Sequence, residues 1–201
     1  MSSILDWAVS ARTLRGEAVS GDLHVLLPFE GGVLAAVIDG LGHGPEAAFA
    51  ARTAGSLLAE NPAASVDALV QRCHAGLRKT RGVVLSLASF RISAAEMTWL
   101  GVGDVEGVLL RADPSTTPPR ETILLRGGVV GYQLPTLRAS SHRVLVGDLL
   151  ILATDGVRHG FLNRQTDDDE APDVIADAIL ADHGKTTDDA LVLVARYRGA
   201  G

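Results

Sequence analysis

The stretch Val33-Leu34-Ala35-Ala36-Val37-Ile38-Asp39-Gly40-Leu41-Gly42-His43-Gly44-Pro45 decides the fold, because it joins a buried strand to a helix through a glycine-rich turn. Its first six residues are apolar, as in a strand that is covered on both faces. After the glycines, residues 46–60 are rich in alanine and carry apolar residues at helical spacing until Asn61-Pro62. The stretch therefore predicts a core strand that ends in a carboxylate beside the start of a helix.

The segments on either side of this strand predict its neighbours. Residues 22–29 form a second strand, and Glu30-Gly31-Gly32 predicts a tight hairpin between the two. Residues 7–14 predict a further strand upstream. Downstream, Ser65 is the expected N-cap of a second helix that runs to about Lys79 and is closed by Gly82.

Most of the remaining chain reads as strands, over residues 83–92, 97–101, 105–111, 121–125, 138–146, 148–153 and 190–198. A third helix is predicted over residues 171–181. Residues 113–119 are too rich in proline for a ladder and predict an exposed loop, and the acidic run 166–170 predicts a solvated loop, since it lacks the Gly and the distal Glu of a calcium loop. The order of elements predicts an α+β layered domain with antiparallel sheets and helices outside.

Composition narrows the class of protein. The 201 residues, of which 47% are hydrophobic, predict a single domain over residues 1–201. The net charge of −6 provides no basic field for nucleic acid or an anionic membrane. No apolar run is long enough for a membrane span and the start lacks a signal-peptide pattern, so we expect a cytoplasmic protein. Cys73 is the only cysteine; it stands next to His74 in a predicted helix, where adjacent residues face different ways, which favours a structural thiol over a catalytic one.

Aspartates recur where the predicted buried strands begin or end, at Asp22, Asp39, Asp155 and the pair Asp188-Asp189. Any one of them can be explained as a turn residue that binds nearby backbone N–H groups. However, Asp-Gly follows an apolar strand twice, at residues 39–40 and 155–156, and glycine allows a carbonyl or a ligand to come close. If these strand ends meet, the clustered carboxylates require cations. Carboxylates suit Mg²⁺ or Mn²⁺, whereas Zn²⁺ calls for His and Cys clusters that the chain lacks.

Four motifs, in this order, resemble the signature of the PPM or PP2C-type metal-dependent protein phosphatases in their bacterial SpoIIE-like branch: Ser20-Gly21-Asp22, Asp39-Gly40-Leu41-Gly42-His43-Gly44, Ala153-Thr154-Asp155-Gly156-Val157 and Thr187-Asp188-Asp189-Ala190. Within that branch, residues 81–84, 101–106 and 127–135 are most similar to the RsbX-type phosphatases of the stressosome, which are bare catalytic domains. The resemblance implies a PP2C-like α+β fold, a four-layer α-β-β-α sandwich of two mainly antiparallel sheets flanked by helices, with two Mn²⁺ or Mg²⁺ ions at one end.

The resemblance also implies roles for the motif residues: Asp39 bridges both ions, Asp22 holds one, Asp155 and Asp188 hold the other, and the Gly40 carbonyl completes the shell. Asp189 is expected to orient a neighbour. Asp104 falls where many relatives carry an Asp of a third, weaker metal position, although RsbX-like chains often have Asn there, and a simple turn residue is the alternative.

Two positions near these motifs concern the substrate phosphate. Animal-type members carry an Arg shortly before the first Asp to grip the phosphate, whereas this chain has Glu17 there. His43 is a candidate catalytic residue that donates to the phosphate or protonates the leaving serine oxygen; the alternative is a surface histidine without a role. The other histidines are interpreted as ordinary strand, helix or loop residues: His24, His74, His142, His159 and His183.

The function implied by the resemblance is a protein serine/threonine phosphatase that dephosphorylates STAS-domain regulators in a bacterial partner-switching pathway, in opposition to a kinase. Three alternatives stay open: a catalytically inactive phosphoprotein-binding module, a SpoIIE- or RsbU-like phosphatase of an anti-anti-sigma factor, and a phosphoesterase of small molecules. The complete set of aspartates argues against the inactive module, since a site without catalysis need not keep clustered charges. A small-molecule enzyme would need a deeper pocket than so short a chain is expected to offer.

Overall fold

The computed structural model describes residues 4–113, 115–165 and 170–199, which form two five-stranded antiparallel sheets and the helices that cover them. The first sheet contains, in spatial order, β1 (Leu5–Arg12), β10 (Ala190–Tyr197), β9 (Leu149–Ala153), β6 (Glu106–Leu110) and β7 (Arg120–Thr122). The second contains β2 (Asp22–Phe29), β3 (Gly32–Gly40), β4 (Val83–Arg91), β5 (Glu96–Val102) and β8 (Ser140–Arg143). The helices are α1 (Gly44–Ala59), α2 (Val66–Gly76), α3 (Pro172–His183) and the short 3₁₀ helix η1 (His159–Asn163).

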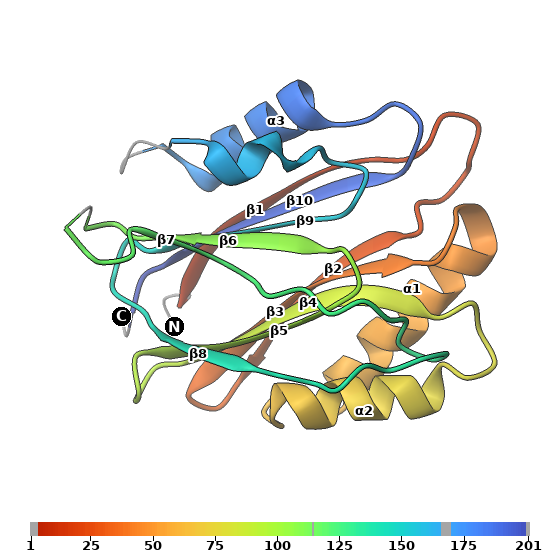
Figure 1. Cartoon of the computed structure of the whole chain (residues 1–201), viewed down its shortest axis with the longest axis horizontal. Helices are drawn as coiled ribbons and strands as arrows, with labels where there is room; N and C mark the ends of the chain where they lie inside the picture. Colours follow the sequence, from red (N-terminus) through yellow and green to blue (C-terminus); the bar gives the residue numbers. More distant parts are fainter. Residues whose placement is uncertain (1–3, 114, 166–169, 200–201) are drawn as a thin grey trace.

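The elements stack in four layers (Figure 1). Helix α3 covers the first sheet and contacts β1 and β10, whereas α1 and α2 cover the outer face of the second sheet. Apolar side chains fill the space between the sheets and both spaces between a sheet and its helices. The antiparallel sheets with helices outside confirm the prediction from the order of elements, and the four layers confirm the sandwich that the resemblance implied.

Strand β3 shows why a continuous apolar run suits the middle of this sandwich. Its odd-numbered residues Val33, Ala35 and Val37 pack between the two sheets, and the even-numbered ones, such as Leu34 and Ile38, pack under the helices. Successive side chains of a strand point to opposite faces, so Asp39 continues the row that faces the other sheet. The alternation thus directs the carboxylate at the strand end into the space between the sheets.

Several predicted boundaries are confirmed and others are corrected. Strand β2 and the Ser65 N-cap of α2 agree with the prediction, and β1 begins and ends two residues earlier than predicted. Helix α2 ends at Gly76, not near Lys79, because the Leu77 carbonyl accepts from Thr80 N in a turn. Gly82 does not close that helix; its carbonyl accepts from Leu41 N.

Strands β7 and β8 are shorter than predicted. Beyond Thr122 the chain leaves the ladder because the side chains of Ile123 and Leu125 pack over Gly101. Beyond Arg143 the chain turns, and Leu145 N donates to the Asp148 carboxylate. Helix η1 was not predicted.

Other predictions concern loops and single residues. Residues 113 and 115–119 carry no strand, as expected for the Pro-rich loop; residue 114 and the acidic residues 166–169 lie outside the described residues. Cys73 is buried against α1 and its pKa is raised to about 12 by burial, which agrees with a structural thiol. Within the part of the chain that the structure describes, no helix has the length and apolarity needed to cross a membrane.

Candidate active site

The two sheets bring the acidic motifs together at one end of the sandwich, on the right in Figure 1. Asp22 at the start of β2 lies directly opposite Asp39 at the end of β3 in the antiparallel ladder. Asp155 follows β9 and Asp188 precedes β10, both from the first sheet. Segments separated by more than a hundred residues therefore meet at this edge.

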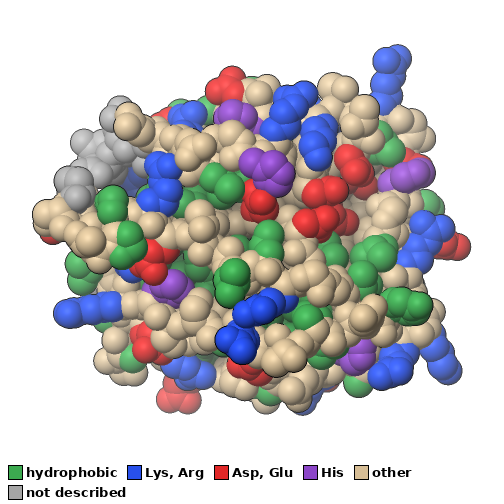
Figure 2. Space-filling view, viewed as in Figure 1, with side chains coloured by type: hydrophobic (Ala, Val, Ile, Leu, Met, Phe, Trp, Pro, Cys, Tyr) green, Lys and Arg blue, Asp and Glu red, His purple; other side chains and the backbone are tan. Residues whose placement is uncertain are grey.

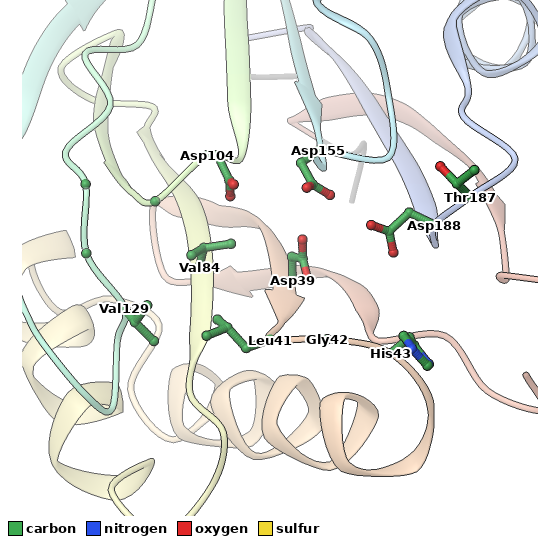
Figure 3. A pocket seen from close by; sticks show the side chains of 13 residues that line it. Asp39, Leu41, Gly42, His43, Val84, Asp104, Val129, Asp155, Thr187 and Asp188 are labelled. Carbon is green, nitrogen blue, oxygen red and sulfur yellow. The ribbon is translucent and has the colours of Figure 1, made fainter.

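A pocket of about 530 Å³ opens at this end. Figure 3 shows the carboxylates of Asp39, Asp104, Asp155 and Asp188 pointing into a common space. The wall is made of these four aspartates together with Leu41, Gly42, His43, Val84, Gly103, Gly127, Gly128, Val129 and Thr187. Acidic side chains gather beside a hollow to the right of the centre in Figure 2.

The aspartates strongly disfavour one another's charge. Burial, followed by repulsion from Asp22 and Asp155, raises the pKa of Asp39 to about 9. Burial raises the pKa of Asp22 to about 7, opposed by the hydrogen bond from Thr154. Burial and then the charge of Asp104 raise the pKa of Asp155. Burial and then the charge of Asp155 raise the pKa of Asp188. The charged carboxylates are therefore disfavoured unless a cation compensates them.

Asp22 is held by a residue that the sequence did not single out. It does not line the pocket but lies opposite Asp39 in the ladder, and Thr154 Oγ1 donates to its Oδ2 over 2.8 Å. The same hydroxyl oxygen accepts from Leu191 N at 2.9 Å. Thr154 directly follows β9 and lies on the strand face that is turned toward the second sheet. The only sign of its role in the sequence was its place in the third motif, one residue before Asp155.

Asp189 anchors a loop and does not reach the pocket wall. Its side chain is buried, with Oδ1 accepting from Leu14 N at 2.7 Å and Oδ2 from Gly21 N at 2.8 Å. These bonds tie the loop between β1 and β2 to the start of β10 and so place Gly21 and Asp22. Both oxygens are engaged, as expected of a residue that orients its neighbours.

The glycines of both Asp-Gly pairs are required by close backbone packing. A Cβ on Gly40 would lie 2.1 Å from the Ala47 carbonyl oxygen of α1, and one on Gly156 would lie 1.8 Å from the Asp189 carbonyl oxygen. No side chain fits in either place. The prediction that a carbonyl approaches these glycines is confirmed, whereas Gly40 itself does not line the pocket.

His43 stands at the edge of the pocket, where its Nδ1–H donates to Glu17 Oε1 at 2.5 Å. Glu17 also lies against Gly44, the first residue of α1, where a negative charge favours the positive end of the helix dipole. The residue in the place of the expected phosphate-binding Arg therefore fixes the candidate histidine. Three of the other histidines bind polar groups away from the pocket: His74 binds Gly131 N, His142 binds Glu121 and His159 binds Glu106.

The donors at this end of the sandwich suit hard divalent cations, since carboxylate oxygens are the ligands that Mg²⁺ and Mn²⁺ prefer. Among residues 4–113, 115–165 and 170–199, no three acidic, His or Cys side chains stand close enough to enclose an ion as they are placed. The raised pKa values nevertheless fit the binding of cations, because burial and mutual repulsion disfavour the charged carboxylates until a cation compensates them. Asp22, Asp39, Asp155 and Asp188 are the residues that could hold the metal, with Asp104 beside them.

Sequence comparison places this site in a family. The family model described as stage II sporulation protein E (SpoIIE) matches residues 30–198. The phosphoserine phosphatase RsbX of Bacillus subtilis (strain 168) is 24% identical over 94 residues, which are 47% of this chain and 47% of that protein. That match therefore spans about half the length of the relative.

Solved structures share the fold over almost the whole chain. A chain from a study of the bacterial stressosome as a modular system adapted to control secondary messenger signalling is 29% identical, with a TM-score of 0.84 over 96% of this chain and 99% of that one. RsbX in complex with magnesium is 18% identical, with a TM-score of 0.83 over 98% and 97%. The serine/threonine phosphatase PstP of Mycobacterium tuberculosis is 17% identical, with a TM-score of 0.73 over 98% and 100%.

The family match covers the strands and loops that carry Asp39, Asp104, Asp155 and Asp188, and the fold agrees with it throughout. The chain belongs to the SpoIIE family of PP2C-type phosphatases.

Proposed function

We propose that this chain is a metal-dependent protein serine/threonine phosphatase whose substrates are phosphorylated STAS-domain regulators. The observation that carries the enzymatic part is the convergence of Asp39, Asp104, Asp155 and Asp188 on one open pocket. The likeness to a chain of the bacterial stressosome, at 29% identity, and to the phosphoserine phosphatase RsbX supports the choice of substrate.

In this proposal Asp22, Asp39, Asp155, Asp188 and the Gly40 carbonyl would hold two Mn²⁺ or Mg²⁺ ions, and Asp104 would belong to a third, weaker position. When bound, the ions supply an activated water and neutralise the charge of the transferring phosphoryl group. The chain's own part is to hold the aspartate and carbonyl oxygens rigidly at the strand ends. Thr154 and Asp189 do so by fixing Asp22 and the loop before it.

His43 completes the proposed site at the leaving-group side. Its Nδ1–H is bonded to Glu17, so the ring acts as an acid when Nε2 also carries a proton. Nε2–H then passes this proton to the departing serine or threonine oxygen as the P–O bond breaks, and the neutral ring keeps its Nδ1–H on Glu17. The Glu17 carboxylate keeps the ring in place at the pocket edge. No covalent phosphoenzyme is needed in this scheme, because a water is the attacking group.

The test is hydrolysis of p-nitrophenyl phosphate and of a phosphoserine protein in Mn²⁺ by wild type and Asp39→Asn. We expect the variant to fold and to lose at least about 100-fold in kcat, and we expect excess EDTA to abolish wild-type turnover. Asp177→Asn, on the exposed side of α3, is the matched control and should behave as wild type. Full activity in EDTA, or an active Asp39→Asn variant, would refute the proposal.

A further inference from the structure

A second cavity, of about 380 Å³, lies between the first turns of α1 and the turn that follows α2. Its lining consists of Pro45, Glu46, Phe49, Lys79, Thr80 and Arg81, and we call it the α1 groove. The first turn of α1 and the turn after α2 lie at the same end of the molecule as the acidic pocket (Figure 1). The site described above uses none of these residues.

The α1 groove adjoins the acidic pocket through Arg81. A Cβ placed on Gly42, which lines the pocket, would lie 2.8 Å from Arg81 Nη1. The turn that carries Arg81 is well anchored: Thr80 Oγ1 donates to the Leu77 carbonyl at 2.8 Å and accepts from Gly82 N at 3.0 Å. The pocket and the groove are therefore neighbours, with Gly42 lining the pocket and Arg81 lining the groove.

The groove lining combines an exposed aromatic side chain, Phe49, with two cationic side chains and one acidic one, Glu46. The Phe49 side chain is exposed on α1, with 58% of its surface accessible. Lys79 makes no ion pair with any residue of the described ranges. Arg81 pairs with Glu46, but both side chains are largely exposed, and such a surface pair contributes little, so a substrate carboxylate can replace Glu46.

Charge complementarity decides what can occupy the groove. The pocket wall carries four aspartates and neither Lys nor Arg. Acidic residues that flank a substrate phosphoserine can therefore contact cationic side chains only outside this pocket. Lys79 and Arg81 are such contacts directly beside it. Acidic side chains would be attracted there, and an apolar side chain among them would cover Phe49.

We propose that the α1 groove binds the acidic, partly apolar segment of a substrate phosphoprotein that flanks the phosphorylated residue. The inference rests on the proposed phosphatase function and adds a determinant of substrate choice to it. The groove acts on affinity for the protein substrate, while the reacting atoms stay in the acidic pocket.

Three probes test this inference: a phosphoserine peptide flanked by Glu and Leu, the same peptide with Gln and Gly in their place, and p-nitrophenyl phosphate. We expect wild type to prefer the acidic peptide by about tenfold in kcat/KM, mainly through KM. Phe49→Ser and Lys79→Glu should each lower the ratio of peptide to aryl phosphate kcat/KM by about tenfold.

Matched controls lie on surfaces that the proposal does not use. Val174→Ser changes an exposed apolar residue of α3, in the opposite layer, and Arg143→Glu makes a charge change equal to that of Lys79→Glu on β8. Both should keep the wild-type ratio. Equal kcat/KM for the two peptides, or ratios unchanged in both groove variants, would overturn the inference.

Binding of the fluorescently labelled peptides, followed by anisotropy, separates this inference from the proposed function. If wild type turns over no probe but still binds the acidic peptide about tenfold more tightly than its neutral partner, the groove stands and the phosphatase proposal fails. If wild type hydrolyses the aryl phosphate and binds the two peptides equally, the phosphatase proposal stands and the groove fails.

Discussion

Thr154 of the first sheet donates from Oγ1 to Oδ2 of Asp22 in the second sheet, over 2.8 Å. The two residues are 132 positions apart in the chain, and this bond lowers the pKa of the Asp22 carboxyl against the effect of burial. A hydroxyl between the sheets therefore keeps one of the candidate metal ligands closer to its charged form.

Replacing this hydroxyl should weaken both stability and metal binding. Thr154→Val keeps the shape of the side chain but leaves the buried Leu191 N without its acceptor, so we expect a loss of about 1–3 kcal/mol in the free energy of unfolding. Without the donor Asp22 holds its proton more tightly, so Mn²⁺ should bind more weakly at pH 7. Urea unfolding and calorimetric titration of Mn²⁺ measure the two effects. Thr154→Ser keeps the hydroxyl and should remain near wild type; equal losses in both variants would contradict this explanation.

The acidic cluster predicts how the metal-free protein responds to pH. Asp39 and Asp22 have pKa values of about 9 and about 7 in the folded chain, above the ordinary 3.8 of an unfolded one, so the folded state binds their protons more tightly. Their contribution to stability is complete below the unfolded value and is lost as the pH rises through the folded values. In EDTA, the melting temperature should fall as the pH is raised from about 5 to about 9.

Two comparisons isolate the cause of that fall. Asp39→Asn removes the carboxyl with the largest rise in pKa and should flatten the curve, while Mn²⁺ should restore stability most at the alkaline end, where it competes with fewer protons. A melting temperature that is constant or rises over this interval in EDTA would show that burial and mutual repulsion do not raise the pKa values of these carboxyls as the structure indicates.

His43 can be tested through the leaving group. A phosphoserine ester releases a strongly basic alkoxide that needs a proton, whereas p-nitrophenolate leaves without one. His43→Gln should therefore lower kcat for a phosphoserine peptide by about 100-fold and change turnover of p-nitrophenyl phosphate by less than about threefold. Glu17→Gln, which weakens the hold on the ring, should show the same pattern to a smaller degree. Similar losses with both substrates would point to a structural role for the histidine.

Local patterns predicted the elements that are buried on both faces. The apolar run of β3 and the helical spacing of α1 were placed within two residues of their observed ends, because burial imposes a period that a short window of sequence already shows. The exposed ends were less accurate. Strand β7 ends at Thr122, after which the side chains of Ile123 and Leu125 pack over Gly101. Because Gly101 lies on a strand of the other sheet, the sequence near β7 does not show this contact.

The candidate site divides in the same way. Aspartates at strand ends and the order of the four motifs pointed to Asp22, Asp39, Asp155 and Asp188, and the family resemblance added Asp104. The structure brings four of these five to one pocket and places Asp22 opposite Asp39 in the ladder. The contact of Glu17 with His43 joins residues 26 positions apart, and no periodicity of the sequence connects them.

The amino-acid sequence by itself determined which segments become strands and helices, which face of each strand is buried and which residues carry charge at the strand ends. It does so because side-chain alternation and backbone preferences act over a few neighbouring residues. Only the tertiary structure decided that Thr154 reaches Asp22, that Glu17 holds His43 and that Arg81 lies between the pocket and the α1 groove. These contacts depend on how two sheets and their helices pack against one another, which is a property of the whole assembled core.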